Sequence, residues 1–207
     1  MKTSDLFVAA LVVLAVACAT AGLFFTTPKR AVLYSVEVPP ASGVIAFDSF
    51  GPAHTCGSNS WAVAGKAHAD WFIPAQSGRL SAIEVAIEPP TRPAGNATVF
   101  LASNRNGFPG AIVESFVVTP QMVNATSNPA PVVINSVSQP VLEAARKYWL
   151  CVRGQGGWLW RFNNQNIIQN SARETRREHW ATAGDYCYIC AFRVLLTTNQ
   201  EPKPPAN

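Results

Sequence analysis

The chain has 207 residues, of which 48% are hydrophobic and only 14% are charged, and its formal net charge is +4. An average soluble chain is about 25% charged. This composition excludes disorder for most of the chain, because disordered segments are rich in charge and poor in apolar residues. The modest charge, without any basic run, also argues against nucleic acid as a partner.

A hydrophobic segment from Leu6 to Phe25 is the first element of the chain, with Lys2 in front of it. Such a run of apolar and small residues is typical of a segment that exports a protein or anchors it in a membrane. Three outcomes stay open: cleavage of a signal peptide after Ala19-Thr20-Ala21, retention as an anchor, or lipidation at Cys18. Each outcome predicts an exported protein, either anchored in the membrane at its N-terminus or secreted to the periplasm or cell surface.

The rest of the chain divides into three parts after the signal or anchor segment, residues 1–25. Residues 26–43 contain Pro28, Pro39 and Pro40 and are expected to form a stalk, while the proline-rich residues 199–207 are expected to be disordered. Residues 44–198 have the length of one ordinary domain and should hold the single folded domain.

Short runs of alternating, β-branched or aromatic residues follow, and each is ended by Gly, Pro, Asn or Ser. Such punctuated runs are typical of strands. The expected strands are Val32 to Val38, Val44 to Phe50, Trp61 to Ala64, Ala69 to Ile73, Leu80 to Ile87, Ala97 to Ser103, Ala111 to Val118, Pro131 to Val137, Tyr148 to Arg153, Trp158 to Phe162 and Ala191 to Thr197. Many short strands at even spacing predict an all-β fold, an antiparallel β-sandwich of the jelly-roll kind.

The most charged part of the chain is the stretch from Arg173 to Glu178, where positive and negative residues are mixed. Mixed charges are typical of a solvated surface, so we expect an exposed loop or helical turn there.

Several local patterns occur in the same order as in a known group of bacterial surface domains. They are Phe47 to Pro52, Trp71 to Ile83, Asn106 to Gly110, Val141 to Ala144 with Tyr148 to Leu150, Trp158 to Asn163 and Ala191 to Val194. In this order they resemble the choice-of-anchor R group and its relatives in exported proteins with PEP-CTERM sorting tails. The resemblance implies a β-sandwich displayed at or beyond the cell surface, and it implies no known activity. The chain differs from the group by lacking the sorting tail and by carrying four cysteines and the charged stretch.

The four cysteines after the export segment are Cys56, Cys151, Cys187 and Cys190. An even number of cysteines in an exported chain predicts disulfides. Of the three possible pairings we favour Cys56 with Cys187 and Cys151 with Cys190, because Cys190 has the inward parity of the following strand. Only Cys187 and Cys190 have the Cys-x-x-Cys spacing, and a zinc ribbon needs two such pairs, so we expect no metal site.

Hydrolase motifs and phosphate-binding glycine loops are absent from the sequence, so we expect no enzymatic activity and no cofactor. One alternative is a jelly-roll metal-dependent oxygenase. His68 and Asp70 would share one face of a strand, and His179 and Arg193 follow in the order that such a site requires. The competing interpretation makes His68, Asp70 and His179 exposed loop residues.

The segment from Trp158 to Asn164 has the composition of a sugar-binding platform. On a strand, Trp158 and Trp160 share one face, and Asn163 and Asn164 follow where they could bond to sugar hydroxyls. The favoured interpretation is a buried aromatic stripe, because large aromatic residues dominate the cores of sandwiches. We therefore expect a non-enzymatic surface or extracellular-matrix domain for adhesion or glycan contact, with extracellular polysaccharide or envelope components as partners. A purely structural envelope module is the alternative.

Overall fold

The computed structural model describes residues 43–90, 95–123, 131–176 and 179–197. These residues form antiparallel strands with two short 3-10 helices, η2 (Pro52–His54) and η3 (Pro120–Met122), which confirms the all-β prediction. The signal or anchor segment, nearly all of the stalk with its expected strand, and the C-terminal tail lie outside the described residues. Within them, no helix has the length and apolar character needed to span a bilayer.

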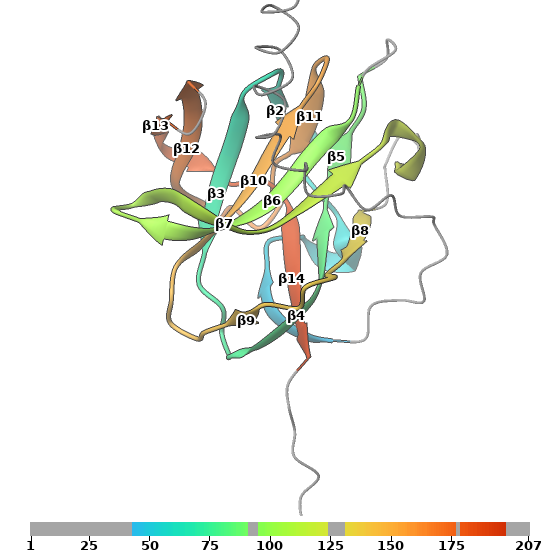
Figure 1. Cartoon of the computed structure of the whole chain (residues 1–207). Helices are drawn as coiled ribbons and strands as arrows, with labels where there is room; N and C mark the ends of the chain where they lie inside the picture. Colours follow the sequence, from blue (N-terminus) through green and yellow to red (C-terminus); the bar gives the residue numbers. More distant parts are fainter. Residues whose placement is uncertain (1–42, 91–94, 124–130, 177–178, 198–207) are drawn as a thin grey trace, which may run out of the picture. The chain divides into compact units, whose positions relative to one another are not determined.

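Two stacked sheets make up the domain, with a small third sheet at one end (Figure 1). The five-stranded sheet contains β1 (Val44–Asp48), β14 (Phe192–Thr197), β4 (Gly78–Val85) and β8 (Val132–Asn135) in this order, with β9 (Val141–Leu142) beside β4. The six-stranded sheet contains β13 (His179–Tyr188), β12 (Ile168–Arg176), β3 (Ala67–Phe72), β10 (Tyr148–Gly154), β6 (Ala97–Arg105) and β7 (Phe108–Val118). The third contains β2 (Ser60–Val63), β11 (Trp158–Arg161) and β5 (Ile87–Glu88).

Eight of these strands have jelly-roll order. One sheet runs β1-β14-β4-β8, and the other contains β3-β10-β6-β7. Within each sheet, neighbouring strands of these series pair antiparallel. The first strand therefore pairs with the last, and strands from the middle of the chain complete both sheets. The β12–β13 hairpin is an addition that widens the six-stranded sheet beyond β3.

Alternation along β10 divides the six-stranded sheet into two unlike faces. Leu150 and Val152 point inward, into the core between the two large sheets, whereas Trp149 and Cys151 point outward into a second, smaller cluster. This division follows from the period of two along a strand.

The charged stretch is a strand and not the exposed loop or turn that we expected. Residues 173–176 belong to β12, and residues 177–178 lie outside the described residues. Glu174 is buried and receives two hydrogen bonds from Arg153, at 2.5 and 3.1 Å, and one from the main-chain N–H of Ala67 at 3.0 Å. Charged residues are compatible with a strand here because Arg153 of β10, two strands away in the same sheet, supplies the opposite charge.

Candidate ligand-binding face

The tryptophans of the predicted sugar platform lie in the interior. Trp158 and Trp160 are both 0% exposed and belong to the inner core, which agrees with the buried-stripe interpretation. Their indole N–H groups donate to the main-chain oxygens of Gly95 and Ala191, at 2.9 and 3.3 Å. Because neither ring presents a face to solvent, neither can stack on a sugar in this structure.

The two asparagines of the same platform make contacts within the fold. The buried Asn163 side chain donates to two main-chain oxygens, at 2.8 and 2.9 Å, and accepts from two main-chain N–H groups at 3.0 Å. All of its hydrogen-bonding capacity is thus used in shaping the loop after β11. Asn164 is exposed and donates to Thr55 Oγ1 at 2.8 Å. Both side chains thus have partners within the fold, and their assignment to a ligand site stays a prediction.

The residues of the alternative oxygenase site are only partly brought together. His68 and Asp70 share the inner face of β3, as their spacing predicted, and both are buried rather than exposed in a loop. His179 is exposed at the start of β13, which β12 separates from β3. Arg193 lies on β14 and forms ion pairs with two acidic side chains there. The triad of His68, Asp70 and His179 is therefore not assembled.

The four cysteines are free thiols, so neither expected disulfide is formed. Cys190 lies in the inner core, as its parity predicted, whereas Cys151 lies in the cluster on the outer face of the six-stranded sheet. A disulfide requires Cβ atoms that point toward each other, whereas Cys151 and Cys190 lie on opposite sides of the six-stranded sheet. Cys56 packs beside a separate small cluster, and the Sγ of Cys187 lies 3.3 Å from Ser171 Oγ.

Small residues cover the middle of the outer face of the six-stranded sheet, and aromatic residues surround them. The small buried residues include Ala67, Ala69, Ala102 and Ala172, and the aromatic residues in the same cluster are Trp71, Phe100, Phe108, Trp149 and Trp180. Small side chains leave room for the two edge strands, β7 and β13, to approach one another over this face. We call this surface, with the grooves described next, the outer face.

The largest groove of the outer face has a volume of about 740 Å³. Rings of Phe100, Phe108 and Trp180 line it, together with Arg105 and the ion pair of Arg153 and Glu174. Phe108 and Trp180 are half-buried, so part of each ring stays accessible to a ligand. The groove thus combines apolar walls with polar groups at fixed positions, as ligand sites do.

Two more hollows continue this groove. One, of about 390 Å³, shares Arg153 and Glu174 with it and adds Lys66 and Arg176. The other, of about 460 Å³, lies past Phe108 and is lined by Trp71, Trp149, Lys147 and polar side chains of β12. In this second hollow the Nζ of Lys147 lies 4.1 Å from the centre of the Trp71 ring, a cation–π contact.

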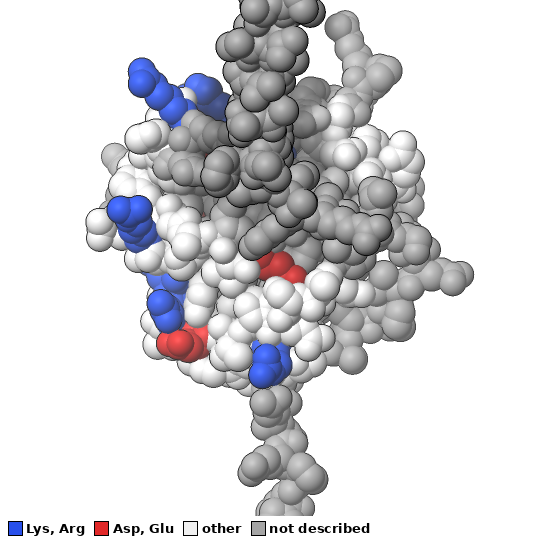
Figure 2. Space-filling model, viewed as in Figure 1, with Lys and Arg blue, Asp and Glu red and all other residues white. Residues whose placement is uncertain are grey.

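Positive charge predominates on the outer face. Among the residues that the structure describes, the charged ones that line the largest groove and the hollow beside it are Lys66, Arg105, Arg153 and Arg176 and a single acidic residue, Glu174. Lys66, Arg105 and Arg176 are exposed and make no ion pair with another residue that the structure describes. Figure 2 shows Lys and Arg side chains along the side where Figure 1 places β12, β13 and the β6–β7 turn. An anionic ligand would therefore be attracted to this face.

No family model matches the chain. A search of curated proteins also finds no significant match.

Sequence reasoning missed the outer face because it treated the β12–β13 region as a loop. A signal was nevertheless present in β10, where Trp149 and Arg153 share the outward parity with Cys151. Trp149 lies directly opposite Trp71 on β3, so two tryptophans occupy neighbouring positions on one face. A tryptophan pair beside an arginine, on the face that does not enter the core, indicates a surface for ligands.

Proposed function

We propose that this chain is an exported, non-enzymatic surface domain that binds an acidic extracellular polysaccharide on its outer face. The observation that carries the proposal is the lining of connected grooves by accessible aromatic rings and by exposed cations, Lys66, Arg105 and Arg176. Jelly-roll sheets offer a rigid support for such a surface, because their register fixes each side chain relative to its neighbours.

The two kinds of side chain have complementary roles toward a sugar acid. The half-buried rings of Phe108 and Trp180 can pack against the C–H faces of sugar rings, which are apolar. Arg105 can pair with a carboxylate through two parallel N–H groups, and Lys66 and Arg176 extend the positive potential along the groove. A polyuronate chain, with one carboxylate on each sugar, fits a groove in which rings and cations alternate.

Two features of the sequence support the location that this function needs. The hydrophobic segment from Leu6 to Phe25 has the composition of an export or anchoring signal. The resemblance to choice-of-anchor R domains is consistent with display at the cell surface, in adhesion or in the organisation of the envelope. The second candidate is a purely structural envelope module, for which the tight β-sandwich would suffice without any ligand.

Affinity electrophoresis of the purified full chain separates these candidates. Gels containing polygalacturonate or alginate should retard the protein, whereas gels containing neutral dextran should not. Retardation should weaken as salt is raised from about 0.05 to 0.5 M, since salt screens exposed charges. Arg105→Gln and Trp180→Ala should each lower the affinity at least about fivefold, which is about 1 kcal/mol.

Matched variants away from the outer face provide the controls. Arg79→Gln removes an exposed arginine from β4 in the opposite sheet, and Tyr188→Ala removes an exposed ring from the far end of β13. Both should bind as the unchanged protein does. Equal mobility of the folded chain in acidic, neutral and polysaccharide-free gels would reject glycan binding in favour of the structural module.

A further inference from the structure

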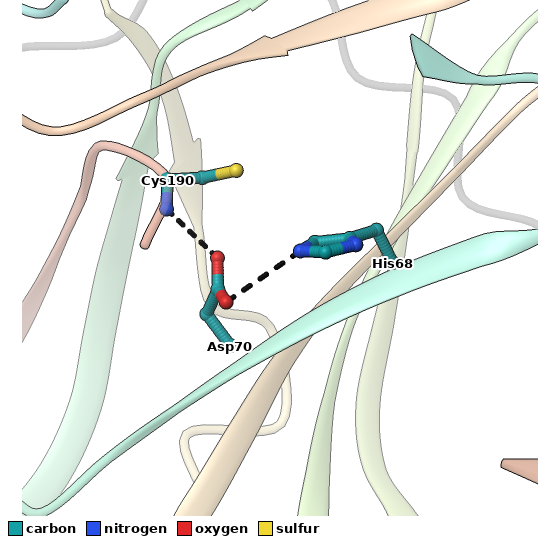
Figure 3. Close-up of side chains that lie close together, drawn as sticks. All are labelled: His68, Asp70 and Cys190. Carbon is teal, nitrogen blue, oxygen red and sulfur yellow. Dashed lines mark hydrogen bonds and ion pairs between the residues drawn. The ribbon is translucent and has the colours of Figure 1, made fainter. Parts of the chain in front are cut away.

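We propose that His68, Asp70 and Cys190 form a buried binding site for a thiophilic divalent cation of the Zn²⁺ type. His68 and Asp70 come from the inner face of β3, and Cys190 comes from the short segment that carries the chain from β13 to β14. One ligand atom of each side chain lies within 4.8 Å of the other two. Figure 3 shows the imidazole and the Cys190 side chain on either side of the Asp70 carboxylate.

The imidazole of His68 has an unsatisfied nitrogen that points into this cluster. Its Nε2 is buried and makes no hydrogen bond, since the nearest carboxylate oxygen, Asp70 Oδ1, is 3.6 Å away. A buried polar group without a partner costs about 1–3 kcal/mol. A cation between the nitrogen, the carboxylate and the sulfur would give Nε2 the partner that it lacks.

Two tryptophans hold the imidazole in this orientation. Trp61 stacks on the His68 ring with centroids 4.8 Å apart, and Trp160 meets it edge to face at 6.0 Å. Packing on two sides fixes the ring and excludes water, and both conditions favour a preorganised metal ligand.

The carboxylate of Asp70 is also oriented by neighbouring groups. Its Oδ2 accepts the main-chain N–H of Cys190 at 2.8 Å, and its Oδ1 accepts the hydroxyl of Ser171. These two hydrogen bonds hold both carboxylate oxygens in place beside the imidazole and the sulfur.

The donor set selects the class of metal. Imidazole nitrogen, carboxylate oxygen and cysteine sulfur together suit Zn²⁺, whereas Ca²⁺ and Mg²⁺ prefer oxygen ligands alone. Around tetrahedral Zn²⁺, bond lengths of about 2.0–2.3 Å place ligand atoms roughly 3.5 Å apart. The three atoms would have to close by about 1 Å, and the contact of Cys190 Sγ with the Trp160 oxygen, at 3.6 Å, is a weak one that such a movement can break.

Cobalt binding by the full chain tests this site. The protein is purified with a reductant and a chelator, unfolded, and refolded with Co²⁺ so that the ion can enter before the core closes. We expect a single Co²⁺ per chain, with a near-ultraviolet sulfur-to-cobalt absorption band and the visible bands of tetrahedral cobalt. Zn²⁺ should displace it and abolish these bands. A folded chain with native near-ultraviolet circular dichroism that takes up no cobalt would overturn the proposal.

Two cysteine variants separate a metal site from a purely structural contact. Cys190→Ala removes the sulfur but keeps the main-chain N–H that Asp70 accepts. It should therefore fold, lose the sulfur-to-cobalt band and bind the ion at least about tenfold more weakly. Cys151→Ala removes an equally buried thiol from the opposite face of the sheet and should keep both properties. Equal cobalt binding by the two variants would show that Cys190 is not a ligand.

Discussion

The two faces of the six-stranded sheet differ in the size and packing of their side chains. The inner face presents branched aliphatic side chains such as Leu150 and Val152 to a second sheet, and these side chains are completely buried. The outer face presents alanines at its centre, and no second sheet in the described part of the chain covers it. One sheet thus supports a closed core on one side and open grooves on the other.

This difference determines which face can hold a buried polar cluster and which face can bind a ligand from solution. The inner face excludes water, so a polar cluster such as His68, Asp70 and Cys190 must be satisfied by its neighbours or by an ion. The outer face leaves Arg105 and Trp180 accessible, so its residues can exchange water for a ligand. The following variants probe that contrast, in order of decreasing effect.

Trp160→Ala should produce the largest loss of stability. The side chain is fully buried in the inner core, and its removal leaves a large cavity and takes away one of the two hydrogen bonds that the Ala191 oxygen accepts. We expect a loss of about 3–5 kcal/mol in the free energy of unfolding, measured by urea denaturation. The partly buried Trp180 on the outer face provides the comparison, and Trp180→Ala should cost clearly less. Equal losses would mean that the two faces do not differ as described.

Glu174→Gln should have an intermediate effect. The change keeps the shape of the side chain but removes the charge that two hydrogen bonds from Arg153 neutralise. We expect a loss of about 1.5–3 kcal/mol in the free energy of unfolding, as for other hydrogen bonds to charged groups. Thermal denaturation at low and high salt provides the measurement, and the loss should persist in high salt because the carboxylate is buried. A loss that disappears in salt would place Glu174 at the surface.

The smallest expected effect concerns the reactivity of the Cys151 thiol. This thiol should be alkylated more slowly in the folded chain than in the unfolded chain. Burial, together with the nearby Asp70 carboxylate, raises the pKa of this thiol well above its usual range. Because the thiolate is the reactive form, iodoacetamide at about pH 8 should alkylate Cys151 only when the chain unfolds. Mass spectrometry of the folded and the urea-unfolded protein measures this. Rapid labelling of Cys151 in the folded chain would show that the outer cluster opens readily.

Much of the fold could be predicted because burial repeats with the period of the strands. In β4, Ile83 and Val85 alternate with smaller or polar residues along the sequence, and both are buried. Alternation also places Cys151 on the face opposite to that of Leu150, outside the core that contains Cys190. The favoured disulfide between Cys151 and Cys190 therefore could not form. The β12–β13 hairpin was missed because its charges are neutralised by a distant strand, through Arg153, and no local pattern reports such a partner.

The candidate sites were harder to predict because they depend on residues far apart in the sequence. His68 and Asp70 were predicted to share one face, and they do, but their third neighbour is Cys190 and not His179. Cys190 lies in the short segment between β13 and β14, more than a hundred residues further along the chain than Asp70. The aromatic composition around Trp158 pointed to the core, while the accessible rings lie on β7 and β13.

The pairing of the first strand with the last also governs when the domain can fold. Val44 of β1 lies opposite Leu196 of β14, and β14 in turn completes the ladder to β4. Joining positions so distant in the chain is slow, because the entropy of closing a long loop must be lost before the contact is gained. A growing chain therefore cannot complete this sheet until β14 has been made. Because β14 lies between β1 and β4, this sheet closes later than the ladders formed by strands that come earlier in the chain.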